Sequence, residues 1–231
     1  MKKRKNIIIS LDDFGIDTAS NKLFLKLLET GKIDRIGIMP NGFITLEESQ
    51  KLLTSKVALD IHLDMLDNIK PEREIKEGFL MRSLMFVFGY IIGTLSAKKI
   101  EKLWEKQLGD FQKIFGKFPD GINSHQHIHF FPPYFKKAIK LSKKHQIKFI
   151  RSGKEFTREI HPIPAILNTL RLVNINSNKK DSFSTSNIMT SFDWIRNFEK
   201  FEESLDPNKK IELIFHPERR EEFEFLKKYL A

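Results

Sequence analysis

The chain has 231 residues, a length that suits one α/β domain, and we expect residues 1–231 to form a single domain with a sizeable core. It contains no cysteine, so disulfides, thiolate metal sites and thiol nucleophiles are excluded, and any metal must be bound by His, Asp or Glu. The net charge is +10, but no RNA-binding motif, zinc finger or helix-turn-helix signature accompanies it, so we expect no nucleic-acid partner. The lack of cysteine fits a reducing compartment, and we expect a cytoplasmic protein.

Short apolar runs alternate with amphipathic segments along the chain. The predicted strands are residues 6–11, 33–39, 57–62, 121–127, 147–151 and 210–216, and a strand-like stretch lies near 170–175. The predicted helices are residues 18–29, 97–115, 133–145, 192–204 and 218–230. Strands that alternate with helices indicate βαβ units and a parallel sheet of six or seven strands. We therefore expect an α/β fold, a distorted TIM-like β/α barrel, with an open doubly wound sheet as the alternative.

Residues 79–95 form the most apolar stretch of the chain. Arg82 interrupts this stretch, and it is shorter than a membrane-spanning helix requires, so a core helix or a dimer contact is the simplest interpretation. The basic net charge supports an alternative, in which the segment docks peripherally on a membrane with anionic lipids. A homodimer is a separate hypothesis.

Unusual polar residues stand at the carboxyl end of nearly every predicted strand. In chain order they are Asp12, Asp13, Asn41, His62, His125, Arg151 and His216. In β/α barrels the carboxyl ends of the strands meet at one rim, where active sites are built. One buried histidine is more often a core residue, but the shared location of these side chains favours a common functional site.

Residues 124–129 read SHQHIH. Side chains alternate between the two faces of a strand, so His125, His127 and His129 are expected to share one face. Three imidazoles would crowd there and repel one another when protonated, whereas a metal ion binds neutral imidazole. Two ligands from this segment are reasonable, and three on one ion are less so, because the strand must soon turn at Pro132. Hydrogen-bonded histidines beside a surface loop are the structural alternative.

The sequence LDDFG places two carboxylates at the end of the first buried strand. A helix-capping turn is one explanation, because Asp favours such positions. Burying two carboxylates is unfavourable, however, unless something compensates them. A cation would compensate one of them, and the other could then act as a general base.

Six short motifs follow one another in the chain: DDFG, PNG, DIHL, SHQHIHFFP, IR and HPE. In this order, from about residue 6 to 217, they resemble the YdjC-type carbohydrate deacetylases, which include the chito-oligosaccharide and hopanoid-associated deacetylases. The resemblance implies a distorted β/α barrel and a divalent ion that is bound by one aspartate and two histidines. Motif by motif, it implies Asp13, His62 and His125 as metal ligands, Asp12 as general base and His216 as acid.

The resemblance also implies that His127 and Arg151 line the same pocket, and Asn41 of the PNG motif is expected to bind substrate there. The chain also departs from the family pattern. Asn123 stands where the family usually has Asp, which removes a charge behind the ligands and affects metal affinity or histidine pKa. Leu11 replaces an alanine, and residues 154–190 match poorly, so substrate contacts there cannot be transferred.

The resemblance implies a metal-dependent hydrolase that removes the N-acetyl group of an amino sugar, on an oligosaccharide or a lipid-linked glycan. Zinc is the expected ion, with Mg, Mn, Co or Fe as alternatives that the ligand set also accepts. Two other functions stay open. One is different metal chemistry, as in a phosphoesterase or an iron oxygenase. The other is a catalytically silent barrel that binds glycans.

Overall fold

The computed structural model describes residues 6–65, 86, 89–156, 162–178, 181 and 183–231. The strands are β1 (Ile7–Phe14), β2 (Arg35–Ile38), β3 (Ala58–Leu63), β4 (Gly121–Ser124), β5 (Phe149–Ile150), β6 (Lys154–Glu155), β7 (Ile188–Ser191) and β8 (Ile211–Phe215). The helices are α1 (Thr18–Leu28), α2 (Leu46–Thr54), α4 (Ala97–Phe115), α5 (Pro132–Lys144), α6 (Pro162–Ser177), α7 (Phe198–Glu203) and α8 (Arg220–Leu230). Two short 3₁₀ segments, η2 (His125–Phe130) and η3 (Phe192–Trp194), follow β4 and β7.

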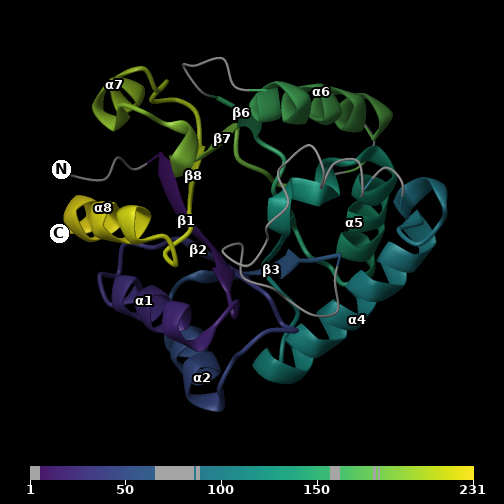
Figure 1. Cartoon of the computed structure of the whole chain (residues 1–231), viewed down its shortest axis with the longest axis horizontal. Coiled ribbons are helices and arrows are strands. Elements are labelled where there is room, and N and C mark those ends of the chain that lie inside the picture. Colours follow the sequence, from purple (N-terminus) through teal and green to yellow (C-terminus); the bar gives the residue numbers. More distant parts are fainter. Residues whose placement is uncertain (1–5, 66–85, 87–88, 157–161, 179–180, 182) are drawn as a thin grey trace.

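These strands form one parallel sheet in the order β5-β4-β3-β2-β1-β8-β7-β6. The sheet curls, and the helices surround it (Figure 1). The edge strands β5 and β6 are consecutive in the chain, and a single parallel bridge joins Phe149 to Ser184, ahead of β7. The expected TIM-like α/β fold is therefore confirmed, as a curled half-barrel with eight strands instead of six or seven.

The outer face of the sheet packs against the helices. In β1, Ile7, Ile9 and Leu11 alternate with Ile8, Ser10 and Asp12 and are buried in the main core. Helix α4 adds buried apolar side chains at helical spacing: Ile100, Trp104, Leu108, Phe111 and Phe115. This division leaves the inner face of the sheet to polar side chains such as Ser10 and Asp12.

Buried ion pairs occupy much of that inner face. Arg35 donates from Nε to Asp60 Oδ2 at 2.7 Å, and its guanidinium lies 3.8 Å from the centroid of the Phe149 ring. Arg151 donates to Glu212 Oε1 at 2.8 Å. An unpaired charge in a protein interior is strongly destabilising, so these pairs allow the barrel interior to be polar.

Three secondary-structure predictions were wrong. The strand predicted at 121–127 ends at Ser124, where η2 begins. The stretch near residues 170–175 lies within α6, although its Val and Ile residues favour strands. A tertiary contact supports the helix, because Asn174 Nδ2 donates to the Phe130 carbonyl at 2.8 Å. The helix predicted at 192–204 is interrupted, since η3 ends at Trp194 and α7 begins only at Phe198.

The hypothesis of membrane docking falls on residues 79–95, most of which lie outside the described residues. The described part includes Ile91 and Ile92, which are exposed. Among the described residues, no helix combines the length and the apolar character that crossing a membrane requires. Peripheral docking and homodimer formation remain predictions.

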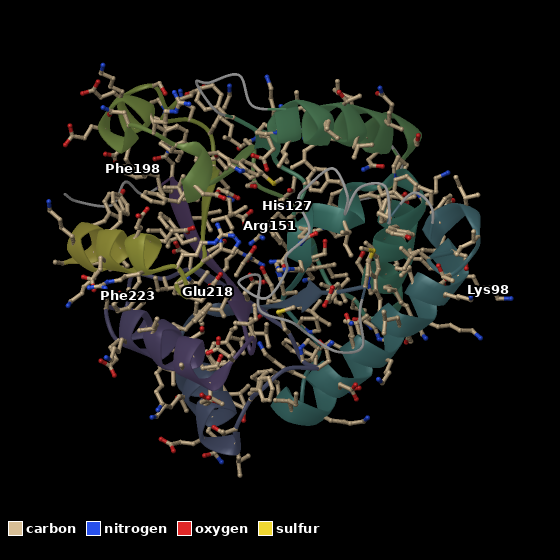
Figure 2. All side chains as sticks on the ribbon, viewed as in Figure 1. Lys98, His127, Arg151, Phe198, Glu218 and Phe223 are labelled. Atoms are coloured by element: carbon tan, nitrogen blue, oxygen red, sulfur yellow. The ribbon has the colours of Figure 1, made fainter. Side chains whose placement is uncertain are left out.

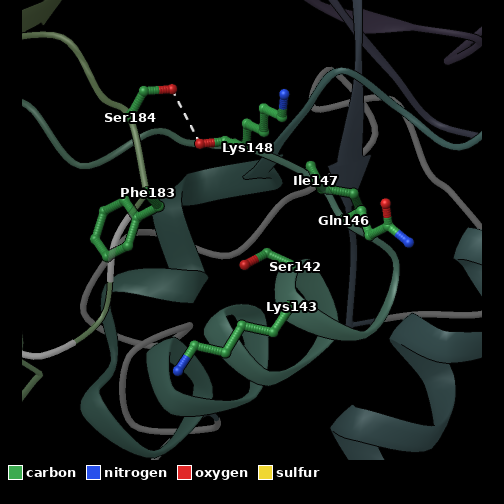
Figure 3. A pocket seen from close by; sticks show the side chains of 7 residues that line it. All are labelled: Ser142, Lys143, Gln146, Ile147, Lys148, Phe183 and Ser184. Atoms are coloured by element: carbon green, nitrogen blue, oxygen red, sulfur yellow. Dashed lines mark hydrogen bonds between the residues drawn. The ribbon is translucent and has the colours of Figure 1, made fainter.

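A surface hollow lies at the amino-terminal end of β5 (Figure 3). Its lining is Ser142, Lys143, Gln146, Ile147, Lys148, Phe183 and Ser184. Ser184 Oγ donates to the Lys148 carbonyl at 2.9 Å, and Lys143 pairs with Asp181. This hollow is at the opposite end of the strands from the polar residues that the sequence singled out.

Candidate active site

The carboxyl ends of the strands bring together side chains that are far apart in the sequence. Asp12 and Asp13 come from β1, His62 from β3, and His125 directly follows β4. Arg151 follows β5, and Figure 2 shows it with His127 and Glu218 near the middle of the molecule.

Asp13 and two histidines form the tightest group at this rim. Asp13 Oδ1 lies 2.9 Å from His62 Nε2 and 3.0 Å from His125 Nδ1. One ligand atom from each of the three residues lies within 4.8 Å of the others. Asp13 Oδ2 is buried and has no hydrogen-bond partner among the described residues. One carboxylate and two imidazoles with a spare buried oxygen suit a divalent ion such as zinc, so the residues fit the group.

The charge of Asp13 is consistent with a ligand role. Burial acts to raise the pKa of its carboxyl, but His125 and then His62 lower it, and the net pKa lies well below the ordinary value. Asp13 is therefore ionised at neutral pH and ready to bind a cation.

The backbone of β1 explains how two adjacent carboxylates serve one site. In a regular strand, Asp12 and Asp13 would point to opposite faces. Asp13 instead has a φ of 72°, and the pairing of β1 with β2 shifts register between Leu11 and Phe14. Left-handed backbone is unfavourable for most residues but is tolerated by Asp. The irregularity turns Asp13 toward His62, while Asp12 stays on the inner face.

Asp12 is held by Arg151. Arg151 donates from Nη1 to Asp12 Oδ2 at 2.5 Å and from Nη2 to Asp12 Oδ1 at 2.9 Å. Burial would raise the pKa of Asp12, but Arg151 and His62 lower it to about 2. Arg151 itself is completely buried, so its influence on the site is exerted through its contact with Asp12.

Asn123 lies behind His62. Its side chain satisfies its neighbours when the amide nitrogen donates to His62 Nδ1 at 2.7 Å and to the Ile61 carbonyl at 2.9 Å. Its oxygen then accepts from Arg151 Nη2 at 3.1 Å. In this orientation the His62 proton is on Nε2, which faces Asp13. Metal binding through Nε2 needs the proton on Nδ1, so the amide must turn over and lose good contacts with Ile61 and Arg151.

We expect Asn123→Asp to tighten zinc binding by about tenfold or more, because a carboxylate accepts from both His62 Nδ1 and Arg151 without turning. The affinity would be measured by competition with a chromophoric chelator. Asn208→Asp, in an exposed turn, adds the same charge away from the site and serves as the control. Equal or weaker zinc binding by the Asn123 variant would contradict this account of His62.

The SHQHIH segment does not continue the strand, so the prediction that three histidines share one face was wrong. β4 ends at Ser124, and Gln126 and His127 have φ values of 52° and 54°. Two successive left-handed residues reverse the chain direction, which separates the imidazoles. Among the described residues, His125 is the one histidine of this segment that belongs to the Asp13 group.

The other two histidines have different surroundings. His129 contacts Ser124 Oγ through Nδ1 at 2.5 Å and the Arg151 carbonyl through Nε2 at 2.7 Å. Burial lowers the pKa of His129 to about 3, so it is a neutral structural residue. His127 is packed against the rings of Phe130 and Trp194, with centroid distances of 6.1 and 6.0 Å.

His216 and Glu218 follow β8 on the other side of the site. Burial would lower the pKa of His216, but Glu222 raises it, and the result is about 10. The backbone N–H of His216 donates to Glu222 Oε2 at 2.7 Å, while the ring Nδ1 lies 3.7 Å from the same oxygen. His216 is therefore an imidazolium at neutral pH. Asn41 lies half-buried in the turn after β2, and its substrate role remains a prediction.

Burial and the charge of Asp13 raise the pKa of Glu218 to about 8. Folded protein therefore binds more protons than unfolded protein between about pH 4.5 and 8, so this group lowers stability as pH rises through that window. The free energy of unfolding of the wild-type protein should therefore fall between pH 5 and pH 8 relative to that of Glu218→Gln. Urea titrations in EDTA at several pH values would test this, and parallel curves for the two proteins would contradict it.

Sequence reasoning missed two supporting residues. A Cβ on Gly37 of β2 would lie 2.8 Å from Asp12 Oδ1 and 3.1 Å from His62 Nδ1, so a larger residue would displace the site. Glu212 of β8 accepts from Arg151 and from Ser10 Oγ, both at 2.8 Å. The sequence did contain a signal for each of them, because Gly37 stands within an apolar strand and Glu212 is a charged residue within the apolar run IELIF.

The YdjC-like protein family model matches residues 6–228, so the chain belongs to the YdjC-like family. A carbohydrate deacetylase of Halalkalibacterium halodurans is 26% identical over 158 residues, which cover 64% of this chain and 63% of the relative. The carbohydrate deacetylase of Mus musculus is 20% identical over 137 residues, or 56% of this chain and 44% of the relative. The match thus spans less than two thirds of either relative.

A solved structure from Enterococcus faecalis V583, described as a candidate cellobiose-phosphate cleavage protein, is also similar. It aligns with a TM-score of 0.61 over 93% of this chain and 81% of that chain, at 18% identity. At this identity the likeness establishes the fold.

Proposed function

We propose that this protein is a metal-dependent N-deacetylase that hydrolyses the acetamide of an amino sugar and releases acetate. The observation that carries the proposal is the convergence of Asp13, His62 and His125 beside the ionised Asp12, at the rim where β/α barrels bind substrates. The family membership and the curated deacetylases support the same reaction.

Asp13, His62 and His125 would hold the divalent ion. When bound, such an ion supplies Lewis acidity toward the acetyl carbonyl and toward the attacking water. Zinc suits one carboxylate and two imidazoles, and the same set accepts iron, cobalt or manganese.

Asp12 and His216 would move the protons. Asp12 remains ionised at neutral pH, so it can accept a proton as water adds to the acetyl carbon. Arg151 orients Asp12 but also lowers its basicity, so Asp12 should release the proton that it accepts from water soon afterwards. His216, an imidazolium at neutral pH, donates to the nitrogen as the C–N bond breaks. A C–O bond forms, a C–N bond breaks, and the products are acetate and an amine.

Substrate contacts would come from the rest of the rim. We place Asn41 and His127 among them, whereas the buried Arg151 would act through Asp12. An amino sugar on an oligosaccharide or a lipid-linked glycan is the proposed substrate class.

The test is acetate release from a panel of N-acetylated sugars, including oligosaccharides and lipid-linked sugars. Protein loaded with zinc, manganese, cobalt or iron would be compared with EDTA-treated protein. We expect release that depends on the added metal. Hydrolysis of phosphate esters without acetate release would favour a phosphoesterase, and sugar binding without any turnover would favour a silent glycan-binding barrel.

A further inference from the structure

A second, smaller apolar cluster lies at the same end of the sheet as the metal ligands. It contains Phe130, Leu167, Met189 and Ile214, and Trp194 packs against it. These residues come from η2, α6, β7, β8 and η3, so five segments meet there. Figure 1 shows α6 beside β6 and β7. The proposed catalytic residues leave this cluster without an assigned role.

Glu155 of β6 faces the same side of the sheet as this cluster. It pairs in register with Met189, and paired residues of neighbouring strands point to the same face. The side chain of Asn168 fixes its backbone, accepting from Glu155 N and donating to Glu155 O, both at 2.9 Å. The direction of the Glu155 side chain is therefore set by two elements.

The Glu155 carboxyl is buried and lacks hydrogen-bond partners within the described part of the chain. Only 3% of the residue is exposed, and neither Oε1 nor Oε2 has a partner there. Buried polar groups in folded proteins are nearly always satisfied, and leaving two oxygens unpaired is destabilising. Ligand-binding sites place a few polar groups among apolar side chains. An unsatisfied carboxyl beside an apolar cluster fits such a site, even though it destabilises the free protein.

The surroundings of Glu155 indicate which ligand it would take. Burial raises the pKa of its carboxyl well above the ordinary value, and the nearby Glu212 and Asp193 raise it further, against the opposing effect of Arg151. A neutral carboxyl offers one O–H donor and one carbonyl acceptor. A hydroxyl group has the matching acceptor and donor. A cationic group is a poorer match, because a neutral carboxyl has no negative charge to balance it.

Two neighbours connect Glu155 to the rest of the rim. Arg151 also binds Asp12, and Asp193 precedes Trp194 in η3. Trp194 is half-buried and contacts the ring of His127, at a centroid distance of 6.0 Å. Its indole offers an apolar face together with a polar edge, a combination that suits the ring of a sugar.

We propose that Glu155 and Trp194 form a sugar-binding subsite beside the metal ligands, in which the Glu155 carboxyl exchanges hydrogen bonds with hydroxyl groups of a neutral sugar ring. This inference rests on the proposed function, because it names how the same site would hold its substrate. It makes Glu155 a binding residue and gives it no part in the proton transfers.

The test compares Glu155→Leu and Glu155→Gln with wild-type protein. Glu155→Leu should raise the melting temperature without sugar, because an unsatisfied buried group is removed. It should also weaken binding of N-acetylglucosamine and its trimer to EDTA-treated protein by about tenfold, and raise KM similarly with kcat within about twofold. Glu155→Gln keeps a donor and an acceptor and should stay close to wild type in binding. Calorimetry measures the binding and scanning fluorimetry the melting.

Glu202→Leu is the matched control. Glu202 is also buried, but its carboxyl accepts from Tyr229 Oη at 3.2 Å, so its loss should lower the melting temperature and leave sugar binding unchanged. If Glu155→Leu is destabilising in the same way, Glu155 has a structural partner and the inference fails. It also fails if Glu155→Leu leaves both sugar affinity and KM unchanged.

The outcomes separate this inference from the proposed reaction. Sugar binding that weakens in Glu155→Leu, with no acetate release by metal-loaded wild type, would retain the subsite and reject the deacetylase. Acetate release with an unchanged KM in Glu155→Leu would support the deacetylase and reject the subsite. If wild-type protein neither binds these sugars at millimolar concentration nor releases acetate, both are rejected.

Discussion

Asp13→Asn should lower zinc affinity by more than about 100-fold and abolish metal-dependent acetate release. Residues that only support metal ligands already change affinity by about 10–100-fold when replaced, and Asp13 lies at the centre of the group. Its Oδ1 is within 3.0 Å of ring nitrogens of both His62 and His125. An amide keeps the shape of the side chain but removes the charge that a divalent cation requires.

Zinc binding would be measured by calorimetry and acetate release by a coupled assay, on the same preparations. Asp17→Asn makes the same chemical change at the start of α1, where the Asp17 side chain accepts from Ser20 N. Asn caps helices as well as Asp does, so this control should retain both properties. Zinc affinity in Asp13→Asn equal to that of wild type would remove Asp13 from the ligand set.

Arg151→Met should destabilise the fold by about 3–5 kcal/mol, because it leaves the buried carboxylates of Asp12 and Glu212 without their cation. Both Nη atoms of Arg151 bind Asp12, and Nε binds Glu212. For a chain of this size, the corresponding drop in melting temperature is about 10 °C. Urea unfolding at pH 7 measures the change.

Arg171→Met is the control for the loss of a guanidinium. Arg171 is half-buried and donates from Nε to one carbonyl, that of Ser152, at 2.8 Å, so we expect a loss of only about 1 kcal/mol. The double variant Arg151→Met/Glu212→Leu should recover part of the loss, because one of the orphaned charges is also removed. An effect of Arg151→Met no larger than that of Arg171→Met would show that the buried carboxylates do not depend on Arg151.

The order of polar residues along the chain was enough to predict which side chains would meet at one rim of the sheet. Asp12, Asp13, His62, His125 and His216 were each placed at the carboxyl end of a strand from the local sequence pattern. Parallel strands meet at one rim, so residues at equivalent positions converge even when they are far apart in sequence. Asp13, His62 and His125, which could hold a metal ion, do lie together at that rim.

Backbone irregularities at the site were not predictable from periodicity. The rule of alternating faces failed at SHQHIH, where Gln126 and His127 have positive φ values, and it would also have separated Asp12 from Asp13. Left-handed backbone in non-glycine residues is unfavourable locally, and it persists only where surrounding contacts fix it. Those contacts come from other strands and are invisible to a local pattern.

By itself, the sequence determined the type of fold and which side chains stand at the strand ends, because hydrophobic periodicity and chain order are local properties. The tertiary structure decided the roles of Arg151, Asn123 and Glu155. Arg151 binds the Asp12 carboxylate 139 positions away, and among the neighbours of Asp12 it does most to lower the pKa of that carboxyl. Glu155 lies in a stretch with no recognisable pattern. The packing of β6, β7 and α6 buries its carboxyl, which has no hydrogen-bond partner in the part of the chain that the structure describes. Charge and hydrogen bonding depend on neighbours in space, which chain order alone does not specify.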